Sequence, residues 1–488
     1  MQSEFEAVIG LEVHVQLATE SKVFSRARSR PEGGRSVGEE LVNMNTSPVD
    51  TAQPGTLPVL NKKVVEFAIK AGLATGCEIR PKSVFSRKHY FYPDLPKGYQ
   101  ISQYDLPICE HGKLEIELKN GESKTITIQR IHIEEDAGKN LHMSGYSLVN
   151  LNRAGVPLIE VVSGPDMRSS EEAVAYLKSL YAIVTYLGVC DGNLQEGNFR
   201  CDANVSVRKR GVEKFGTRAE IKNVNSFRFV EKAIDYEILR QIEVVKSGGT
   251  VIQETRGFDS AKGQTFSMRS KEEAHDYRYF PDPDLPPLIL KKAQIESIRG
   301  SLPELPQAKR DRFISLYDLS KYDATVLTQD KKLSEYYEES LGGIGNSKEL
   351  GKKVANLITS ELARLLNDAD LDITGSKVSA KQIREIAKLL SDDSVSFSMA
   401  KQIITILWTE GGDVSSVVEK HGFKQMSDTS SLEPIIDKII AENEKNVQDY
   451  RAGKEKLIGF FVGQAMKATG GKANPGMLQD LVKKKLKG

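Results

Sequence analysis

The chain is poor in the residues that build disulfide or zinc scaffolds, with only four cysteines and one tryptophan among 488 residues. Cys77, Cys109, Cys190 and Cys201 lie too far apart in sequence for a Cys-x-x-Cys pair or a zinc knuckle. We therefore expect buried thiols, as in a reducing compartment. The sequence also lacks a run of the ~18 apolar residues that a membrane helix needs. These absences predict a cytoplasmic protein without a membrane span.

Net charge is nearly absent as well. Lys and Arg total 68 against 67 for Asp and Glu, which leaves +1, and 39% of the residues are hydrophobic. This balance excludes a wholly basic nucleic-acid coat, a polyacidic tail and a disordered chain. Contact with a nucleic acid must therefore come from local patches. The start, MQSEFEAVIG, has no basic region before an apolar run, so no secretory or transit peptide is expected.

Several familiar catalytic motifs are missing. The sequence contains no Gly-x-x-x-x-Gly-Lys-Ser/Thr phosphate loop, no Gly-x-Gly-x-x-Gly after a strand, no Gly-x-Ser-x-Gly elbow and no His-Glu-x-x-His helix. If this chain handles a nucleotide, it must therefore do so with metal-bound carboxylates on a different scaffold.

The length corresponds to about three domains of ~150 residues. Alternating polarity with frequent Gly and Pro makes the chain β-rich up to about residue 290, with helices predicted at 170–187 and 229–246. A Pro-rich stretch at 281–287 ends this region, because proline blocks both helix continuation and ladder hydrogen bonds. Beyond it the pattern is helical, with a capping box formed by Ser379 and Gln382.

The predicted fold class is therefore α+β, with a β-rich cradle domain followed by all-α helical and tail domains. The expected limits are 1–292, 293–412 and 413–488, the last boundary following the pair Gly411 and Gly412. From Leu457 onward six lysines face one acid, a local charge of +5 that attracts phosphates. Composition alone favours a solvated, frayed helix for this end.

Four strand-like segments carry polar side chains at every second position, so that each set shares one face. A single strand of this kind is usually just half exposed. Four of them with carboxylates in one β-rich block favour an oxygen-rich site suited to Mg²⁺. The polar faces are formed by Glu12, His14 and Gln16; by His132 and Glu134, beside Glu135 and Asp136; by Asp202, Asn204 and Ser206; and by Arg218, Glu220 and Lys222.

Lys88 stands just before an aromatic and proline-rich loop, where a lysine is usually a solvated cation. The aromatic loops at 89–108 and 275–287 are suited to stacking on nucleobases. Tyrosines beside prolines also commonly anchor a loop to the core, and the sequence slightly favours that interpretation.

Ten segments spread over the whole chain resemble the B subunit of the aspartyl/glutamyl-tRNA(Asn/Gln) amidotransferase, the GatB family. The resemblance is collinear, and motifs of this length do not arise by chance. The segments are 8–17 (VIGLEVHVQL), 90–94 (YFYPD), 96–103 (PKGYQISQ), 134–139 (EEDAGK), 151–160 (LNRAGVPLIE), 200–204 (RCDAN), 219–223 (AEIKN), 276–281 (DYRYFP), 450–454 (YRAGK) and 459–467 (GFFVGQAMK).

The resemblance implies a carbon–nitrogen ligase. Its B subunit uses ATP and Mg²⁺ to phosphorylate the side-chain carboxylate of a glutamate or aspartate mischarged on tRNA(Gln) or tRNA(Asn), and ammonia then gives the amide. A separate amidase (A) subunit supplies the ammonia from glutamine through a channel, and a small C subunit holds the two together. This chain contains nothing that suggests a glutaminase nucleophile.

Carried over by motif, the resemblance implies catalytic and metal-handling roles for one histidine and three glutamates. It places Lys88 at the mouth of the ammonia channel, where its charge state would govern passage, and makes the basic tail a tRNA-binding module. The metal and phosphate set is Glu12, His14, Glu135 and Glu220, with Glu134, Asp202 and Asn204 as neighbours that bind the cofactor.

Two positions depart from the family pattern. Many relatives carry Asp where this chain has Asn150, which is nearly isosteric but removes one charge. Some relatives carry Cys-Pro-x-Cys where this chain has 47–50 (SPVD), so any metal role of those cysteines is absent here. Two other interpretations remain open on the residues alone: a tRNA-binding scaffold whose carboxylates are structural, and a metal-dependent hydrolase that acts without partners.

Overall fold

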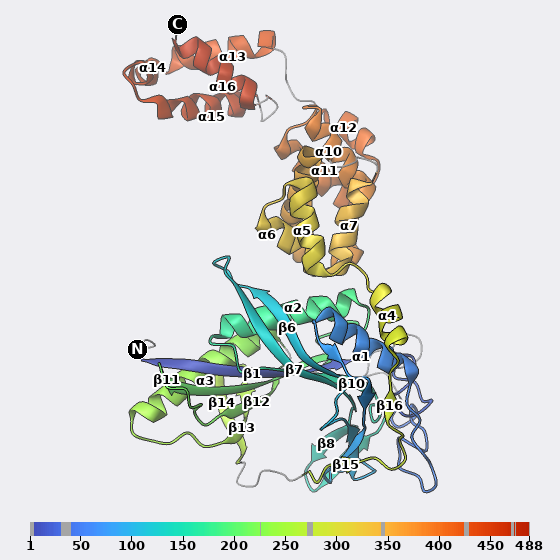
Figure 1. The fold of residues 1–488 in the computed structure, drawn as a ribbon. Helices are drawn as coiled ribbons and strands as arrows, with labels where there is room; N and C mark the ends of the chain where they lie inside the picture. Colours follow the sequence, from blue (N-terminus) through green and yellow to red (C-terminus); the bar gives the residue numbers. More distant parts are fainter. Residues whose placement is uncertain are drawn as a thin grey trace. The chain divides into compact units, whose positions relative to one another are not determined.

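In the computed structural model, strand β1 (Phe5–Gln16) lies in the middle of a nine-stranded sheet (Figure 1). The strand order is β14-β13-β12-β11-β1-β10-β7-β6-β2, and only β12 and β13 pair in parallel. The structure describes residues 4–30, 41–224, 226–270, 277–342, 347–423, 429–469, 473 and 475–487. The other strands of this sheet are β2 (Glu78–Ile79), β6 (Cys109–Glu117), β7 (Ser123–Glu135), β10 (Pro157–Ser163), β11 (Phe199–Lys209), β12 (Ala219–Val224), β13 (Glu254–Asp259) and β14 (Gln264–Ser270).

The alternating sequence of β1 gives the sheet two different faces. Leu11, Val13 and Val15 are almost completely buried on one face, whereas Glu12 and His14 lie on the other and are only partly buried. Burial of each of these aliphatic side chains contributes ~1.5–3 kcal/mol. Because a shift of one residue would exchange the two faces, this burial fixes the register of β1 and so the direction of its polar side chains.

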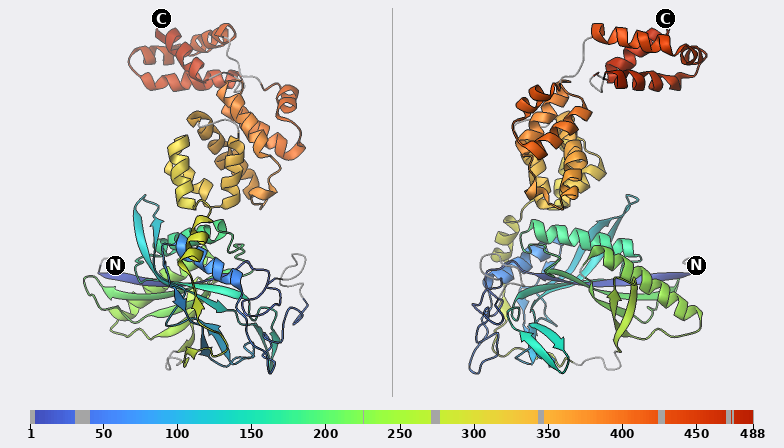
Figure 2. Two further views of the ribbon diagram at one scale, coloured as in Figure 1. Left: turned by 45° about the vertical axis from the view of Figure 1, so that its right-hand side comes forward. Right: turned by 180° about the vertical axis from the view of Figure 1, so that it is seen from behind.

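Three helices cover the apolar face of the sheet (Figure 2): α1 (Lys62–Ala74), α2 (Ser170–Tyr186) and α3 (Phe227–Lys246). The two helices predicted from the sequence are α2 and α3, and both predictions are confirmed to within two residues at the ends. The hydroxyl of Ser169 accepts a hydrogen bond from Glu172 N and so caps α2. With one face filled, chemistry in this unit is left to the polar face.

Three smaller sheets complete the first unit, and one of them carries Lys88. The order β15-β4-β5 joins the two aromatic segments, because Phe280 on β15 pairs with Arg87 on β4. The strands are β3 (Lys82–Ser83), β4 (Ser86–His89), β5 (Tyr99–Ser102), β8 (Lys139–Met143), β9 (Tyr146–Asn150), β15 (Phe280–Pro281) and β16 (Leu288–Ile289).

The second compact unit runs from Pro306 to Gly488 and is helical, so the predicted α+β class is confirmed. The capping box of Ser379 and Gln382 begins α10 as predicted. The helices are α5 (Pro306–Tyr317), α6 (Lys321–Thr328), α7 (Lys331–Leu341), α8 (Lys348–Leu357), α9 (Ala363–Asp368), α10 (Ala380–Ser391), α11 (Phe397–Glu410), α12 (Val414–His421), α13 (Thr429–Glu442), α14 (Glu444–Arg451), α15 (Ile458–Ala468) and α16 (Pro475–Lys487).

The compact units extend past the limits expected from proline and glycine. The first ends at Leu305 instead of residue 292, because Ile295 and Ile298 of α4 (Lys292–Gly300) pack against the core of the first unit. The second unit has two hydrophobic cores. Val414 of α12, which lies beyond residue 412, belongs to the first of these two cores, and the last core begins at Leu432. Apolar contacts therefore extend these cores beyond the proline and glycine positions at which the sequence predicted domain boundaries.

The four cysteines are buried and unpaired, as predicted. Within the described ranges no helix combines the length and the apolar character that crossing a bilayer requires.

Candidate functional site

Five neighbouring strands bring polar side chains to the face of the large sheet that lies opposite helices α1, α2 and α3. His14 on β1 lies opposite Glu160 on β10 and opposite Arg200 on β11. Glu160 in turn lies opposite His132 on β7. Two residues earlier on β1, Glu12 lies opposite Asp202 on β11. The polar faces that periodicity could only place strand by strand therefore converge on one surface.

The first group on this face consists of two imidazoles and two carboxylates, and we call it the imidazole–carboxylate group. His14 Nε2 lies 3.4 Å from Glu160 Oε2 and 3.6 Å from Glu134 Oε1. His132 Nε2 lies 3.6 Å from Glu160 Oε2 and 3.8 Å from Glu134 Oε2. Each histidine thus contacts both carboxylates, and only His14 is appreciably exposed, with 19% of its side chain accessible.

These contacts shift the protonation equilibria in opposite directions. Burial lowers the pKa of His14, but Glu160 and Glu134 more than reverse this effect and raise the pKa to about 9. Burial raises the pKa of Glu160, yet His132 and His14 hold that pKa well below its usual range. The pKa of Glu134 is lowered in the same way, against the effect of burial. His14 is therefore an imidazolium at neutral pH, and both glutamates are ionised.

A second group, which we call the carboxylate group, lies beside the first and consists of Glu12, Asp202 and Glu220. Lys222 Nζ donates to Asp202 Oδ2 at 2.8 Å and lies 2.9 Å from Glu220 Oε1. Asn204 Nδ2 donates to Glu12 Oε1 at 3.0 Å. One ammonium and one amide thus hold three acids together, with Lys222 placed between two of them.

Electrostatics in the carboxylate group favour a cation. Burial raises the pKa of Glu12, and the neighbouring charges of Glu160 and Glu220 raise it further. Burial lowers the pKa of Lys222, but Asp202 and Glu220 more than reverse this and keep the pKa raised. Crowded acids of this kind are stabilised by added positive charge.

The donor atoms of both groups fit a divalent ion. One ligand atom each from Glu12, Asp202 and Glu220 lie within 4.8 Å of one another, and so do those of His14, Glu134 and Glu160. Opposite ligands of a Mg²⁺ ion are about 4.2 Å apart, since each bond is ~2.1 Å long. Small side-chain movements therefore close either set. The all-oxygen carboxylate group matches Mg²⁺ best, because imidazole favours softer metals.

The structure divides the predicted metal set of Glu12, His14, Glu135 and Glu220. Glu12 and Glu220 belong to the carboxylate group, and His14 belongs to the imidazole–carboxylate group together with the predicted neighbour Glu134. Glu135 lies in neither group. Its carboxylate accepts from Lys97 Nζ at 2.5 and 2.6 Å and from Ile101 N at 2.8 Å. Glu135 therefore pairs with Lys97 and the backbone of β5, whereas Glu134 points towards His14 and His132.

Lys88 lies on β4 among aromatic rings, with Nζ 4.9 Å from the centre of the Tyr277 ring. Burial lowers the pKa of Lys88, but Glu134 and Glu160 keep it raised, so the side chain is cationic. The rings of Tyr104 and Tyr279 stack at 4.3 Å, and the rings of His89 and Phe280 stack at 5.0 Å. The two aromatic segments thus pack on each other, and residues 275 and 276 lie outside the described residues.

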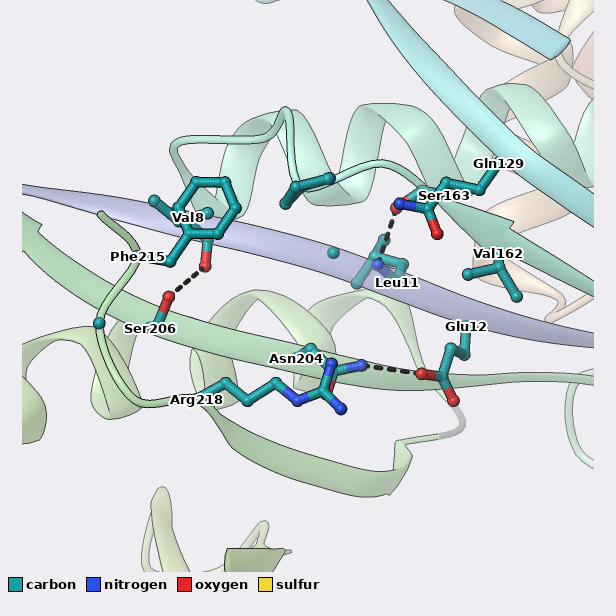
Figure 3. A pocket seen from close by; sticks show the side chains of 13 residues that line it. Val8, Leu11, Glu12, Gln129, Val162, Ser163, Asn204, Ser206, Phe215 and Arg218 are labelled. Carbon is teal, nitrogen blue, oxygen red and sulfur yellow. Dashed lines mark hydrogen bonds between the residues drawn. The ribbon is translucent and has the colours of Figure 1, made fainter. Parts of the chain in front are cut away.

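Two pockets flank these groups on the same face. The first, which we call the Arg218 pocket, has a volume of about 240 Å³ and borders Glu12 (Figure 3). Figure 3 shows the Arg218 guanidinium beside Asn204 and the Phe215 ring at the far end. The second, the Arg153 pocket, has a volume of about 290 Å³ and includes Arg200, the cross-strand neighbour of His14.

Sequence reasoning missed Glu160 as a site residue. A signal was present, because Glu160 is the one ionisable residue of the buried strand β10, PLIEVVS. A buried acid in an apolar strand needs partners of opposite charge or polar contacts. His132 and Lys222 were placed on the correct faces, but their contacts depend on register across several strands.

Comparison with known proteins shows the family to which this chain belongs. Residues 7–296 match the GatB/GatE catalytic domain family, and residues 335–486 match the GatB domain family. The chain is 56% identical over 485 residues to the B subunit of the aspartyl/glutamyl-tRNA(Asn/Gln) amidotransferase of Thioalkalivibrio sulfidiphilus, covering 99% of this chain and 100% of the relative. The corresponding B subunit of Syntrophotalea carbinolica is 55% identical over 489 residues, covering 100% of both chains.

The large sheet with its polar face is therefore the catalytic domain of a tRNA-dependent amidotransferase subunit. More narrowly, the chain belongs to the family of aspartyl/glutamyl-tRNA(Asn/Gln) amidotransferase B subunits, which confirms the resemblance found in the sequence. The name of this family implies that each member is one part of a larger enzyme.

Proposed function

We propose that this subunit phosphorylates the side-chain carboxylate of a glutamate or aspartate mischarged on tRNA(Gln) or tRNA(Asn), and then amidates it. A carboxylate oxygen attacks the γ-phosphorus of ATP, and ADP leaves. Ammonia then attacks the acyl carbon, inorganic phosphate leaves, and the nitrogen loses a proton. The observation that carries the proposal is the pair of adjacent acid-lined groups on one sheet face. Two anions must meet in this reaction, which needs positive charge between them.

We assign Mg²⁺ to the carboxylate group and the nucleotide to the Arg218 pocket. Bound Mg²⁺ neutralises phosphate charge and orients the transferring group. Glu12 borders both the carboxylate group and the pocket, so a nucleotide there has its phosphates next to the acids. Arg218 offers a planar set of donors for phosphate, and Phe215 offers an aromatic ring for the base.

The protonated His14 and the cationic Lys88 act on the acceptor side of the site. Both stabilise the ionised forms of Glu134 and Glu160. Ammonia comes from an amidase (A) subunit, which a small C subunit holds in the complex. We assign Lys88 to the point at which the ammonia enters the site. As a fixed cation, Lys88 repels ammonium and admits only neutral ammonia.

The basic end of the chain serves tRNA binding. Lys483 and Lys484 on α16 are exposed, whereas Lys485 is tied to Asp437 at 2.8 Å. Exposed lysines neutralise phosphates at a distance of up to about one Debye length, ~8 Å. We place this reaction in the cytoplasm, in agreement with the unpaired thiols.

The test is Glu220→Gln in the reconstituted complex, with ammonium as the nitrogen donor. The proposal requires loss of ATP-dependent amidation by at least about a hundredfold, while the amidase still hydrolyses glutamine. Glu78→Gln, an exposed glutamate on edge strand β2, is the matched control and keeps full activity. Retained amidation in Glu220→Gln would refute the site assignment.

One observation favours a second candidate, a tRNA-binding scaffold whose acids are structural. Lys222 already neutralises Asp202 and Glu220 through short contacts. Transfer of the γ-phosphate to mischarged tRNA by the complex would exclude this candidate, and its absence would favour it.

A further inference from the structure

The Arg153 pocket lies at the end of the polar face opposite the Arg218 pocket. Along β1, Gly10 and Glu12 border the Arg218 pocket, His14 follows, and Gln16 lines the Arg153 pocket. Alternate residues of a strand are ~7 Å apart. The Arg153 pocket therefore begins one side chain beyond the imidazole–carboxylate group. Its lining is Gln16, Asp136, Arg153, Gln195, Glu196, Gly197 and Arg200.

Both signs of charge meet in this pocket. Arg153 Nε and Arg200 Nη2 each lie 3.2 Å from the same oxygen, Asp136 Oδ2. Asp136 is buried, and its attraction is the largest cause of the raised pKa of Arg200. Glu196 on the rim is exposed. A pocket for phosphate alone would not contain two acids, because they repel an anion.

The rim of the pocket is fixed before any ligand arrives. Asn198 Nδ2 donates to both carboxylate oxygens of Asp191, at 2.9 and 3.0 Å. Gln16 N donates to Asn198 O at 2.9 Å, which ties the rim loop to the end of β1. Arg153 is held from the other side by donating to Ala137 O at 3.1 Å. Preformed polar groups cost little ordering entropy when a ligand binds.

We propose that the Arg153 pocket binds the aminoacyl group at the 3′ end of the mischarged tRNA, an inference that rests on the proposed function and deepens it. The ester-linked residue carries an α-ammonium and a side-chain carboxylate. Glu196 on the rim pairs with the α-ammonium. Arg200, beside His14, pairs with the side-chain carboxylate and aims it at the imidazole–carboxylate group.

In this assignment the two reactants bind in separate pockets. The nucleotide occupies the Arg218 pocket and the aminoacyl group occupies the Arg153 pocket, so the γ-phosphate and the carboxylate meet between them, near Glu12 and His14. Arg153, with 42% of its side chain exposed, contacts the ester end of the substrate. Uncharged tRNA lacks both charges of the aminoacyl group and gains nothing from this pocket.

The experiment measures equilibrium binding by the reconstituted complex, without ATP. The probe is tRNA that carries glutamate through a non-hydrolysable amide at its 3′ end, compared with the same tRNA uncharged. The wild-type complex is expected to bind the charged form more tightly. Glu196→Gln and Arg153→Gln reduce this preference by about tenfold or more, while the affinity for uncharged tRNA stays the same. Arg80→Gln, which removes an arginine that is paired with Glu110 on β6 and lines neither pocket, is the matched control and keeps the preference.

A second probe isolates the ammonium contact. Acetylation of the α-amino group of the charged probe weakens binding to the wild-type complex and has no further effect on Glu196→Gln. An unchanged preference in both variants, or an equal loss for charged and uncharged tRNA, would overturn the proposal. Weakened ATP binding in the variants would overturn it too, because the pocket would then hold the nucleotide. None of these outcomes depends on amidation, so failure of the catalytic proposal is recognised separately by Glu220→Gln.

Discussion

His14 and Glu160 face each other across strands β1 and β10, with Nε2 of the histidine 3.4 Å from Oε2 of the glutamate. This contact connects the strand that carries the clearest sequence motif to a strand whose role was not apparent from the sequence. It also holds His14 in its charged form, at the junction between the two groups of the polar face.

Glu160→Gln is expected to lower the pKa of His14 from about 9 towards 6.5. A neutral amide does not stabilise the imidazolium, so the remaining effect of burial favours the neutral ring. Nitrogen NMR of the isolated protein across pH 5–10, with His14→Gln to assign the signal, measures the shift. An unchanged titration would mean that Glu160 does not hold the proton on His14.

Glu134→Gln is expected to lose activity, whereas Glu135→Gln is expected to lose stability. Glu134 lies in the imidazole–carboxylate group, so its variant folds normally and loses about tenfold or more of its amidation activity. Glu135 neutralises Lys97, whose side chain is 13% exposed, so Glu135→Gln costs about 3 kcal/mol of stability. Thermal melting and amidation rates of both variants separate the two effects. Equal melting temperatures with equal loss of activity would contradict the division.

Lys222→Met is expected to make the protein depend on Mg²⁺ for stability. Without the ammonium, the acids Asp202 and Glu220 repel each other, and a divalent ion restores the balance. The melting temperature of the variant should therefore fall in chelator and rise with Mg²⁺ more than that of the wild type. If Mg²⁺ shifts both proteins equally, the carboxylate group does not bind the ion.

Asp50→Asn is expected to destabilise the first unit by about 3–5 kcal/mol, because it removes the carboxylate that faces a buried lysine. Lys22 is fully buried, and its Nζ lies 3.2 Å from Asp50 Oδ2. Asp50 stands at the last position of the segment where some relatives carry two cysteines, so an ion pair holds this loop here. The loss of stability is measured from the thermal transition of the first unit. The double variant Lys22→Met with Asp50→Leu should recover most of it, and no recovery would contradict the account.

The sequence was sufficient to predict helices α2 and α3, the buried cysteines and the polar side of each strand, because these depend on local periodicity. It could not establish that β10 lies between β1 and β7, since strand order is set by packing between distant segments. Glu160 was missed for this reason. The sequence also could not show which of Glu134 and Glu135 lies beside His14 and Glu160, because that depends on contacts between distant strands; the catalytic role of Glu135 stays a prediction.

The central claim is that the side-chain carboxylate of the substrate attacks ATP in this subunit. Mischarged tRNA labelled with ¹⁸O in that carboxylate tests it directly, in the reconstituted complex with ammonium as the nitrogen donor. If an acyl phosphate forms, one ¹⁸O atom passes from the substrate to the inorganic phosphate released with each amide, and Glu220→Gln releases none. Amide formation accompanied by unlabelled phosphate would contradict the account.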